Sequence, residues 1–216
     1  MSSTQNGFTL WELMMALVVA GIVLSLGVPS FMEFQRNGAM TAAANDLLGA
    51  VLLARTEAVK RQVPVTLCVT PDSSADPPAC EVAGSDGAFV VFVDENGNGD
   101  PTDATDGNAE VDADEPVLLR REPPGGAIEV WTDIGYVTFA PNGFPRQALG
   151  QADDSATVML FCDDRGNRPA AGASSSARAV RIAATGRGGV RQEITDVTAA
   201  VDELADAGVA ADCPGP

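Results

Sequence analysis

The sequence predicts an α+β protein in which one long N-terminal helix packs on antiparallel β-sheets. Three observations support this prediction: an apolar segment near the N-terminus, a helical pattern that continues beyond it, and short β-type segments in the remainder. With 216 residues, the chain fits one domain of ordinary size plus an additional element. We expect a membrane-spanning helix half at residues 8–29, an amphipathic half at 30–62, a β-rich region at 63–195 and an acidic tail at 196–216.

Residues from Phe8 to Val28 are nearly all apolar, and a helix of about 20 such residues spans the hydrocarbon core of a bilayer. A secretory signal normally has a basic N-terminal region, a shorter apolar stretch and a small-residue cleavage site after that stretch. Residues 1–7 contain neither Lys nor Arg, and no such cleavage site follows the apolar segment. We therefore expect the segment to remain in the mature protein as a single transmembrane helix.

One charged residue, Glu12, interrupts the apolar segment. A carboxylate inside a membrane helix costs roughly 3 kcal/mol or more unless it is paired, so such a residue is a candidate for function. In the alternative interpretation, Glu12 lies near the membrane interface and extends its carboxylate to water. The chemistry of the residue alone favours neither interpretation.

Beyond Pro29 the helical pattern continues to about Arg61. Apolar residues recur there with 4-3-4 spacing, at Leu47, Val51, Ala54 and Ala58. This spacing gives one apolar face, which Leu48 and Leu52 widen. Glu57 and Arg61 form an i, i+4 pair on the other side. We expect this half of the helix to pack on a sheet.

Eight short segments rich in Val, Phe and Ile, separated by Gly, Pro, Asn and Asp, predict β-strands. They are Val63–Val69, Ala88–Val93, Val117–Arg121, Ala127–Trp131, Tyr136–Ala140, Ala156–Cys162, Ala179–Ala184 and Val190–Ile194. No helical pattern separates them, so the sheets should be antiparallel. In the tail, Val197, Val201 and Leu204 predict a short helix that begins near Asp196.

Composition argues against an enzyme. The chain contains no His, which is the commonest general base near neutral pH and a common metal ligand. It also has no nucleophile elbow, phosphate-binding loop or dinucleotide-binding fingerprint. With 30 acidic and 13 basic residues, the formal net charge is −17, so the average surface repels nucleic acid and anionic lipid.

The four cysteines, Cys68, Cys80, Cys162 and Cys213, form no CxxC pair, which argues against a zinc or thioredoxin-like site. An even number of scattered cysteines outside the cytosol indicates disulfides. Three connectivities are available, and we predict the pairing of nearest neighbours. Reduced cysteines in a cytosolic protein are the weaker interpretation because of the membrane segment.

The stretch Gly7-Phe8-Thr9-Leu10-Trp11-Glu12 resembles the prepilin cleavage motif of type IV pilins and type II secretion pseudopilins. The resemblance implies that a membrane peptidase removes residues 1–7 as a leader and that the new N-terminal Phe8 is methylated. Glu12 would be the fifth mature residue and would pair with the Phe8 amine of a neighbouring subunit. Pro29 takes the position of a helix-bending proline. The leader departs from the family pattern because it lacks a basic residue. In the alternative interpretation, the chain is a generic single-pass membrane protein, and residues 1–7 are not removed.

The β-rich region resembles the GspH/FimT-type minor pseudopilins. Four stretches in chain order carry this resemblance: Pro64 to Cys68, Val91 to Gly99, Val137 to Phe139 with Pro141 to Gly143, and Ala184 to Arg187. It implies a pilin fold and a minor subunit that assembles into, initiates or caps a type IV pilus or a type II secretion pseudopilus. The implied partners are a prepilin peptidase, other pilins or pseudopilins, and the bacterial inner membrane, with the β-rich region in the periplasm.

The segment from Asp94 to Glu115 holds nine carboxylates and no basic residue. The start of a calcium-binding loop is matched by Asp94, Asn96, Asn98 and Gly99, which Asp100, Asp103 or Asp106 would complete. However, Thr105 stands where an EF-hand has its bidentate acid. A solvated turn, typical of Asn-Gly pairs, is the favoured interpretation, so we expect no cofactor, with calcium as the alternative.

Arginines follow in the last third of the chain. Some FimT-like proteins take part in DNA uptake through a C-terminal Gly-Arg-x-Arg motif, which the stretch from Gly186 to Arg191 approximates with its second arginine displaced. Arg178 and Arg181 would support Arg187 and Arg191, but three residues apart on a strand they would face opposite sides. The alternative function is therefore weak, salt-sensitive DNA binding at a pilus tip. Charge balance against the many carboxylates is the favoured interpretation.

Overall fold

The computed structural model describes residues 7–80, 87–95, 107–112, 114–125, 128–148, 157–169, 171–209 and 213. The chain divides into two compact units, Met1–Gly38 and Ala39–Pro216. We call the second unit the head. Residues 1–6 of the predicted leader lie outside the described residues.

Helix α1 (Leu10–Arg61) is continuous through Pro29. Proline has no N–H to donate to the carbonyl of Ser25, one turn earlier, so α1 lacks that one helical hydrogen bond. One turn before Pro29, the Ser25 hydroxyl donates to the carbonyl of Ile22 (2.8 Å). The helix ends where Gln62 adopts a left-handed conformation (φ 62°). In the last turn, Glu57 accepts hydrogen bonds from Lys60 (3.1 Å) and from Arg61 (2.6 Å), which confirms the predicted i, i+4 pair.

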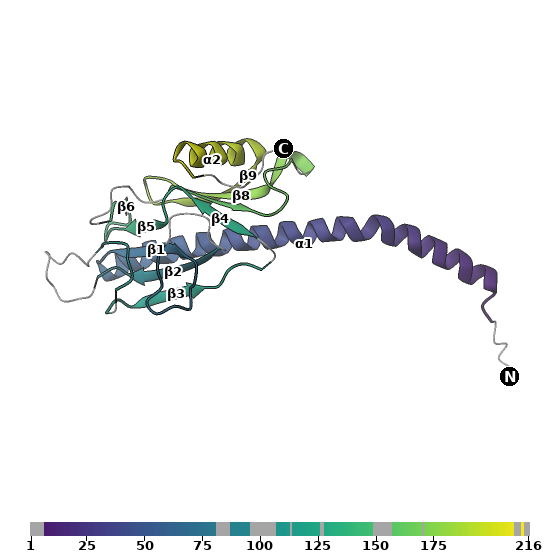
Figure 1. Ribbon diagram of the computed structural model, residues 1–216, viewed down its shortest axis with the longest axis horizontal. Coiled ribbons are helices and arrows are strands. Elements are labelled where there is room, and N and C mark those ends of the chain that lie inside the picture. Colours follow the sequence, from purple (N-terminus) through teal and green to yellow (C-terminus); the bar gives the residue numbers. More distant parts are fainter. Residues whose placement is uncertain are drawn as a thin grey trace. The chain divides into compact units, whose positions relative to one another are not determined.

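The head contains two antiparallel sheets (Figure 1). The first has the strand order β3-β2-β1-β5-β6, formed by β1 (Val65–Thr70), β2 (Ala88–Val93), β3 (Val117–Arg121), β5 (Tyr136–Phe139) and β6 (Pro145–Arg146). The second has the order β4-β7-β8-β9, formed by β4 (Glu129–Thr132), β7 (Val158–Cys162), β8 (Ser174–Ile182) and β9 (Gly188–Glu193). A short 3-10 turn, η1 (Ala171–Ala173), precedes β8.

Both sheets pack on the second half of α1. The predicted apolar face is buried in one core with residues of both sheets, at Leu47, Val51, Ala54 and Ala58. Successive side chains of strands β7 and β8 point alternately to the two faces of the second sheet. Met159, Phe161 and Val180 join the α1 core, whereas Leu160 and Ala179 join a second core on the other face. Because β7 is buried on both faces, its sequence is a continuous apolar run.

Helix α2 (Ile194–Asp206) covers that other face of the second sheet. It buries Val197, Ala200 and Leu204, and it begins two residues before the predicted start at Asp196. The structure contains the disulfides Cys68–Cys80 and Cys162–Cys213, which is the predicted nearest-neighbour pairing. The second disulfide ties the chain beyond α2 to the end of β7.

We expect Cys213→Ser to lower the free energy of unfolding of the head by roughly 2–4 kcal/mol, because the disulfide restricts the unfolded chain. Urea titration of a head fragment beginning near Gln35 measures this change. Ala207→Ser, at an exposed position just after α2, is the control for adding a hydroxyl. An unchanged urea midpoint in Cys213→Ser would show that α2 is held by its apolar contacts alone.

Candidate processing and assembly site

The bond between Gly7 and Phe8 precedes α1 and is not part of the helix. The Phe8 side chain is 81 % exposed, so the bond is open to an enzyme. A Cβ atom added at Gly7 would meet no atom within 4 Å. The fold of this chain therefore does not require glycine at position 7.

Thr9 and Glu12 form a reciprocal cap at the start of α1. The Glu12 carboxylate accepts hydrogen bonds from the backbone N–H of Thr9 (3.0 Å) and from its hydroxyl (2.8 Å). The Glu12 N–H in turn donates to the Thr9 hydroxyl oxygen (3.3 Å). This geometry is a capping box. The prediction for Glu12 rested on its charge and did not include this cap, although the sequence signal for the cap, Thr-x-x-Glu, is present at residues 9–12.

The first part of α1 is long and apolar enough to cross a membrane, with a mean hydropathy of 2.2 in its most apolar window. Its large apolar side chains are exposed along the whole segment, from Leu10 to Val28. An exposed apolar surface of this extent needs a lipid or protein environment. Glu12 is the one charged residue in the segment.

Of the residues proposed for calcium, Asp94 lies in the described part of the chain, whereas Asn96, Asn98, Gly99 and the aspartates 100, 103 and 106 lie outside it. The buried Asp94 carboxylate accepts hydrogen bonds from the hydroxyl of Thr66 (2.5 Å) and from the N–H of Ala109 (3.1 Å). Burial raises the pKa of Asp94 to about 6. Asp94 therefore anchors the segment at residues 107–112 to strand β1. Among the described residues, no group of three His, Cys, Asp or Glu side chains converges on a metal position.

The structure does not bring the four predicted DNA-binding arginines together. Arg178 is buried and donates to the carbonyls of Ser175 (2.6 Å) and Ala177 (2.8 Å). Its burial, together with the nearby charge of Arg165, lowers its pKa.

Arg181 faces α2 and pairs with Glu203 (2.7 Å). Arg187 and Arg191 are exposed. The acidic tail thus neutralises one of the four arginines and burial removes another, so the predicted cluster is reduced to two residues.

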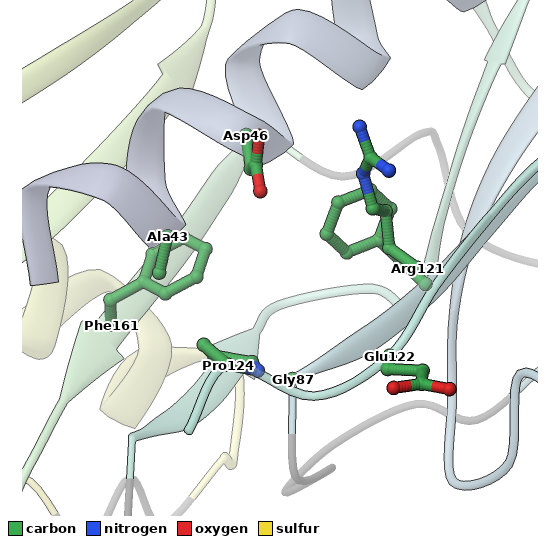
Figure 2. Close-up of a pocket in the computed structure, with 8 residues that line it drawn as sticks. Ala43, Asp46, Gly87, Arg121, Glu122, Pro124 and Phe161 are labelled. Atoms are coloured by element: carbon green, nitrogen blue, oxygen red, sulfur yellow. The ribbon is translucent and has the colours of Figure 1, made fainter. Parts of the chain in front are cut away.

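A small pocket of the head lies between α1 and the two sheets (Figure 2). Ala43, Phe89 and Phe161 form its apolar wall, and Asp46 and Arg121 lie at its rim. Its volume is about 40 Å³, whereas sites for small organic ligands have about 300–1,000 Å³. The pocket is therefore too small to serve as a ligand site.

Comparisons with known proteins match the chain to two family models. The type II transport protein GspH matches residues 43–186, and the prokaryotic N-terminal methylation motif matches residues 2–28. Two crystal structures of the type IV minor pilin FimU from Pseudomonas aeruginosa are also similar. They have TM-scores of 0.45 and 0.41 and identities of 14 % and 15 %. The similarity covers 73 % and 70 % of this chain and 92 % and 91 % of theirs.

A comparison with curated proteins finds no match. The GspH match ends at Gly186, so β9 and α2 lie beyond it. None of the matches supports DNA binding. The methylation motif includes the apolar, exposed start of α1, and the GspH match covers the last part of α1 and strands β1 to β8. The chain therefore belongs to the family of the type II transport protein GspH, and it is a membrane-anchored protein of the pilin and pseudopilin class.

Proposed function

We propose that a prepilin peptidase cuts the bond between Gly7 and Phe8, that the new N-terminus is methylated, and that the mature subunit assembles with other pilins from the inner membrane. The subunit initiates or caps a pilus or secretion pseudopilus, with its head in the periplasm. The observation that carries this proposal is the exposed Gly7–Phe8 bond directly before α1, whose apolar segment from Leu10 to Val28 has one charged residue, Glu12.

The two charges at the start of α1 explain why assembly would be favourable. Cleavage gives Phe8 a positive amine in an apolar environment, while Glu12 carries a negative charge in the same environment. A buried ion pair is tolerable where each charge alone is costly. Pairing the amine of one subunit with Glu12 of the next would therefore couple docking to removal from the bilayer.

The first test is the N-terminus of the mature protein. Intact-mass analysis of membrane fractions should show a chain that begins at a methylated Phe8. Because a Cβ at position 7 meets nothing in this chain, effects of substitution there should report the fit to the peptidase. Gly7→Ala should slow cleavage modestly, and Gly7→Val by at least about tenfold, a barrier difference of about 1.4 kcal/mol.

Gly21→Val is the matched control, since an added Cβ at Gly21 also meets no atom within 4 Å but the residue is distant from the cut in sequence. This variant should be cleaved at the normal rate. A full-length leader on the wild-type chain, in cells that process their other prepilins, would contradict the proposal.

A further inference from the structure

The head exposes large apolar side chains on one side of α1. Leu52 is 46 % exposed and Val59 is 45 % exposed. They are seven residues apart, which is about two helical turns, so they lie on the same face of the helix. Val59 contacts the turn after β5, where a Cβ added at Gly143 would lie 3.0 Å from its Cγ2 atom. The next residue in that turn, Phe144, is 48 % exposed.

Arg55 lies on the same side of α1, where it contacts two hairpin turns from different sheets. The turn between β8 and β9 contains Gly186, whose carbonyl accepts a hydrogen bond from Arg55 Nη1 (3.2 Å). The turn between β5 and β6 contains Gly143. Both glycines have positive φ, 77° at Gly143 and 73° at Gly186.

The two turns approach each other so closely that a Cβ at Gly186 would lie 2.5 Å from the Gly143 carbonyl oxygen. The glycines of the Pro141-Asn142-Gly143 and Thr185-Gly186-Arg187 stretches therefore permit this junction. Hydrogen bonds close each turn, from Gly143 N–H to the Ala140 carbonyl (2.8 Å) and from Gly186 N–H to the Ala183 carbonyl (2.7 Å). The junction gives the surrounding surface a defined shape.

Acidic residues are sparse in the segments that form this surface. Residues 47–56, 134–148 and 171–192 contain no Asp or Glu, although the chain as a whole has a net charge of −17. Glu57, two residues before Val59, lies on another side of α1 and pairs with Lys60 and Arg61. Arg187 is exposed beside Gly186. We define the apolar–basic patch as Leu52, Arg55, Val59, Phe144 and Arg187.

We propose that the apolar–basic patch docks a different pilin subunit that presents carboxylates beside apolar side chains. The inference rests on the proposed function, because the partner is a subunit of the same fibre. Interface centres are enriched in aromatic residues and arginine, and Phe144 with Arg55 and Arg187 provides both. Because three residues of the patch belong to α1, the helix that begins with the assembly motif, contacts at both ends of one helix would fix the subunit in its fibre.

Other occupants fit the patch less well. Two copies facing each other through the patch would place arginines of like charge opposite one another, which costs several kcal/mol. Docking the patch on the acidic α2 of another copy would be a heterologous contact, which repeats to give a ring or an open chain of identical copies. The proposed function instead places the subunit at the start or the cap of a fibre of other pilins. Nucleic acid would leave the three apolar side chains without a role.

Photocrosslinking in the full-length chain tests the inference. A photoreactive residue is introduced at Leu52 or Phe144, in cells that produce the assembly machinery. A probe at Val18, in the membrane-spanning segment, reports assembly itself. A probe at Ala199, which is exposed on α2, is the control for random contact.

We expect the Leu52 and Phe144 probes, but not the Ala199 probe, to crosslink a different protein that mass spectrometry identifies by a processed prepilin N-terminus. A Val18 crosslink without crosslinks at Leu52 and Phe144 would contradict docking at the apolar–basic patch and would leave the proposed function standing. Crosslinks from Leu52 and Phe144 to a second copy or to DNA would also overturn it. If Val18 forms no crosslink either, the proposed function fails and the patch inference with it.

Charge reversal provides a second readout. Arg187→Glu should lower the yield of the Leu52 crosslink several-fold, because it places a carboxylate opposite the acidic partner. Arg168→Glu makes the same charge change at an exposed arginine before β8, at the opposite end of that strand, and should leave the yield unchanged. Resistance of the head to protease in membranes verifies that both variants are folded. Equal yields in the two folded variants would overturn the role of charge in the proposed docking.

Discussion

Glu12→Leu is expected to abolish incorporation of the subunit into fibres while membrane insertion and leader removal continue. The substitution removes the cost of a carboxylate in the bilayer, so the helix should insert at least as well as the wild-type helix. It also removes the proposed partner of a neighbouring Phe8 amine, which would then be buried without a counter-charge. The measurement is the amount of the subunit in sheared, sedimented fibres relative to the amount in membranes.

The capping geometry requires a control, because Glu12 also accepts two hydrogen bonds from Thr9. Loss of a helix cap costs about 1 kcal/mol and could by itself disturb the start of α1. Glu12→Gln retains an oxygen that can accept from Thr9 but has no charge, whereas Thr9→Ala retains the charge without the hydroxyl. If Glu12 pairs with the Phe8 amine of a neighbouring subunit, the Glu12→Gln subunit should fail to enter fibres, and the Thr9→Ala subunit should enter them. The reverse result would assign Glu12 to the cap and would exclude the ion pair.

The spacing of apolar residues along the chain made most of the helices and strands predictable. Two predicted strands, Ala88–Val93 and Val117–Arg121, have the bounds of β2 and β3, because Gly, Pro and charged residues mark their ends. Strand β8 begins at Ser174, five residues before the predicted start at Ala179. Its first half is small and polar, and it becomes strand through pairing and through burial of Ser175 and Ser176, neither of which local sequence shows.

The candidate site was predictable to a different degree in its two parts. The processing motif is a contiguous sequence, so the order of residues identifies it directly. The placement of the arginines depends on tertiary structure. Arg181 meets Glu203 only because α2 folds back onto the second sheet, and Arg178, opposite Phe161 of β7, is buried within that sheet. Likewise, the contact between the Gly143 and Gly186 turns joins segments 43 residues apart, and nothing in either segment indicates the other.

The second large effect is the pH dependence of the free energy of unfolding of the head. The pKa of Asp94 is raised from 3.8 to about 6, first because of burial, while hydrogen bonds from Thr66 and Ala109 and the charge of Arg146 partly oppose the shift. The folded state therefore binds more protons than the unfolded state between about pH 4 and pH 6. Stability should fall as the pH rises through this window and then remain constant. The decrease is at most about 3 kcal/mol, at 1.4 kcal/mol for each unit of pKa.

Asp94→Asn should remove this dependence and raise the stability of the head at pH 7 by about 1–2 kcal/mol. The amide oxygen can still accept from Thr66 and Ala109, and no charge has to be buried, although the new NH₂ group needs a partner. Urea titrations of the head at several values between pH 4.5 and 7.5 measure the slope, with Asp114→Asn as the control at an exposed carboxylate. Repeating them with calcium tests the cation interpretation, because an ion at Asp94 would stabilise the wild type but not Asp94→Asn. Equal slopes in Asp94→Asn and the wild type would show that Asp94 does not titrate in this window, and that another group sets the pH dependence of the stability of the head.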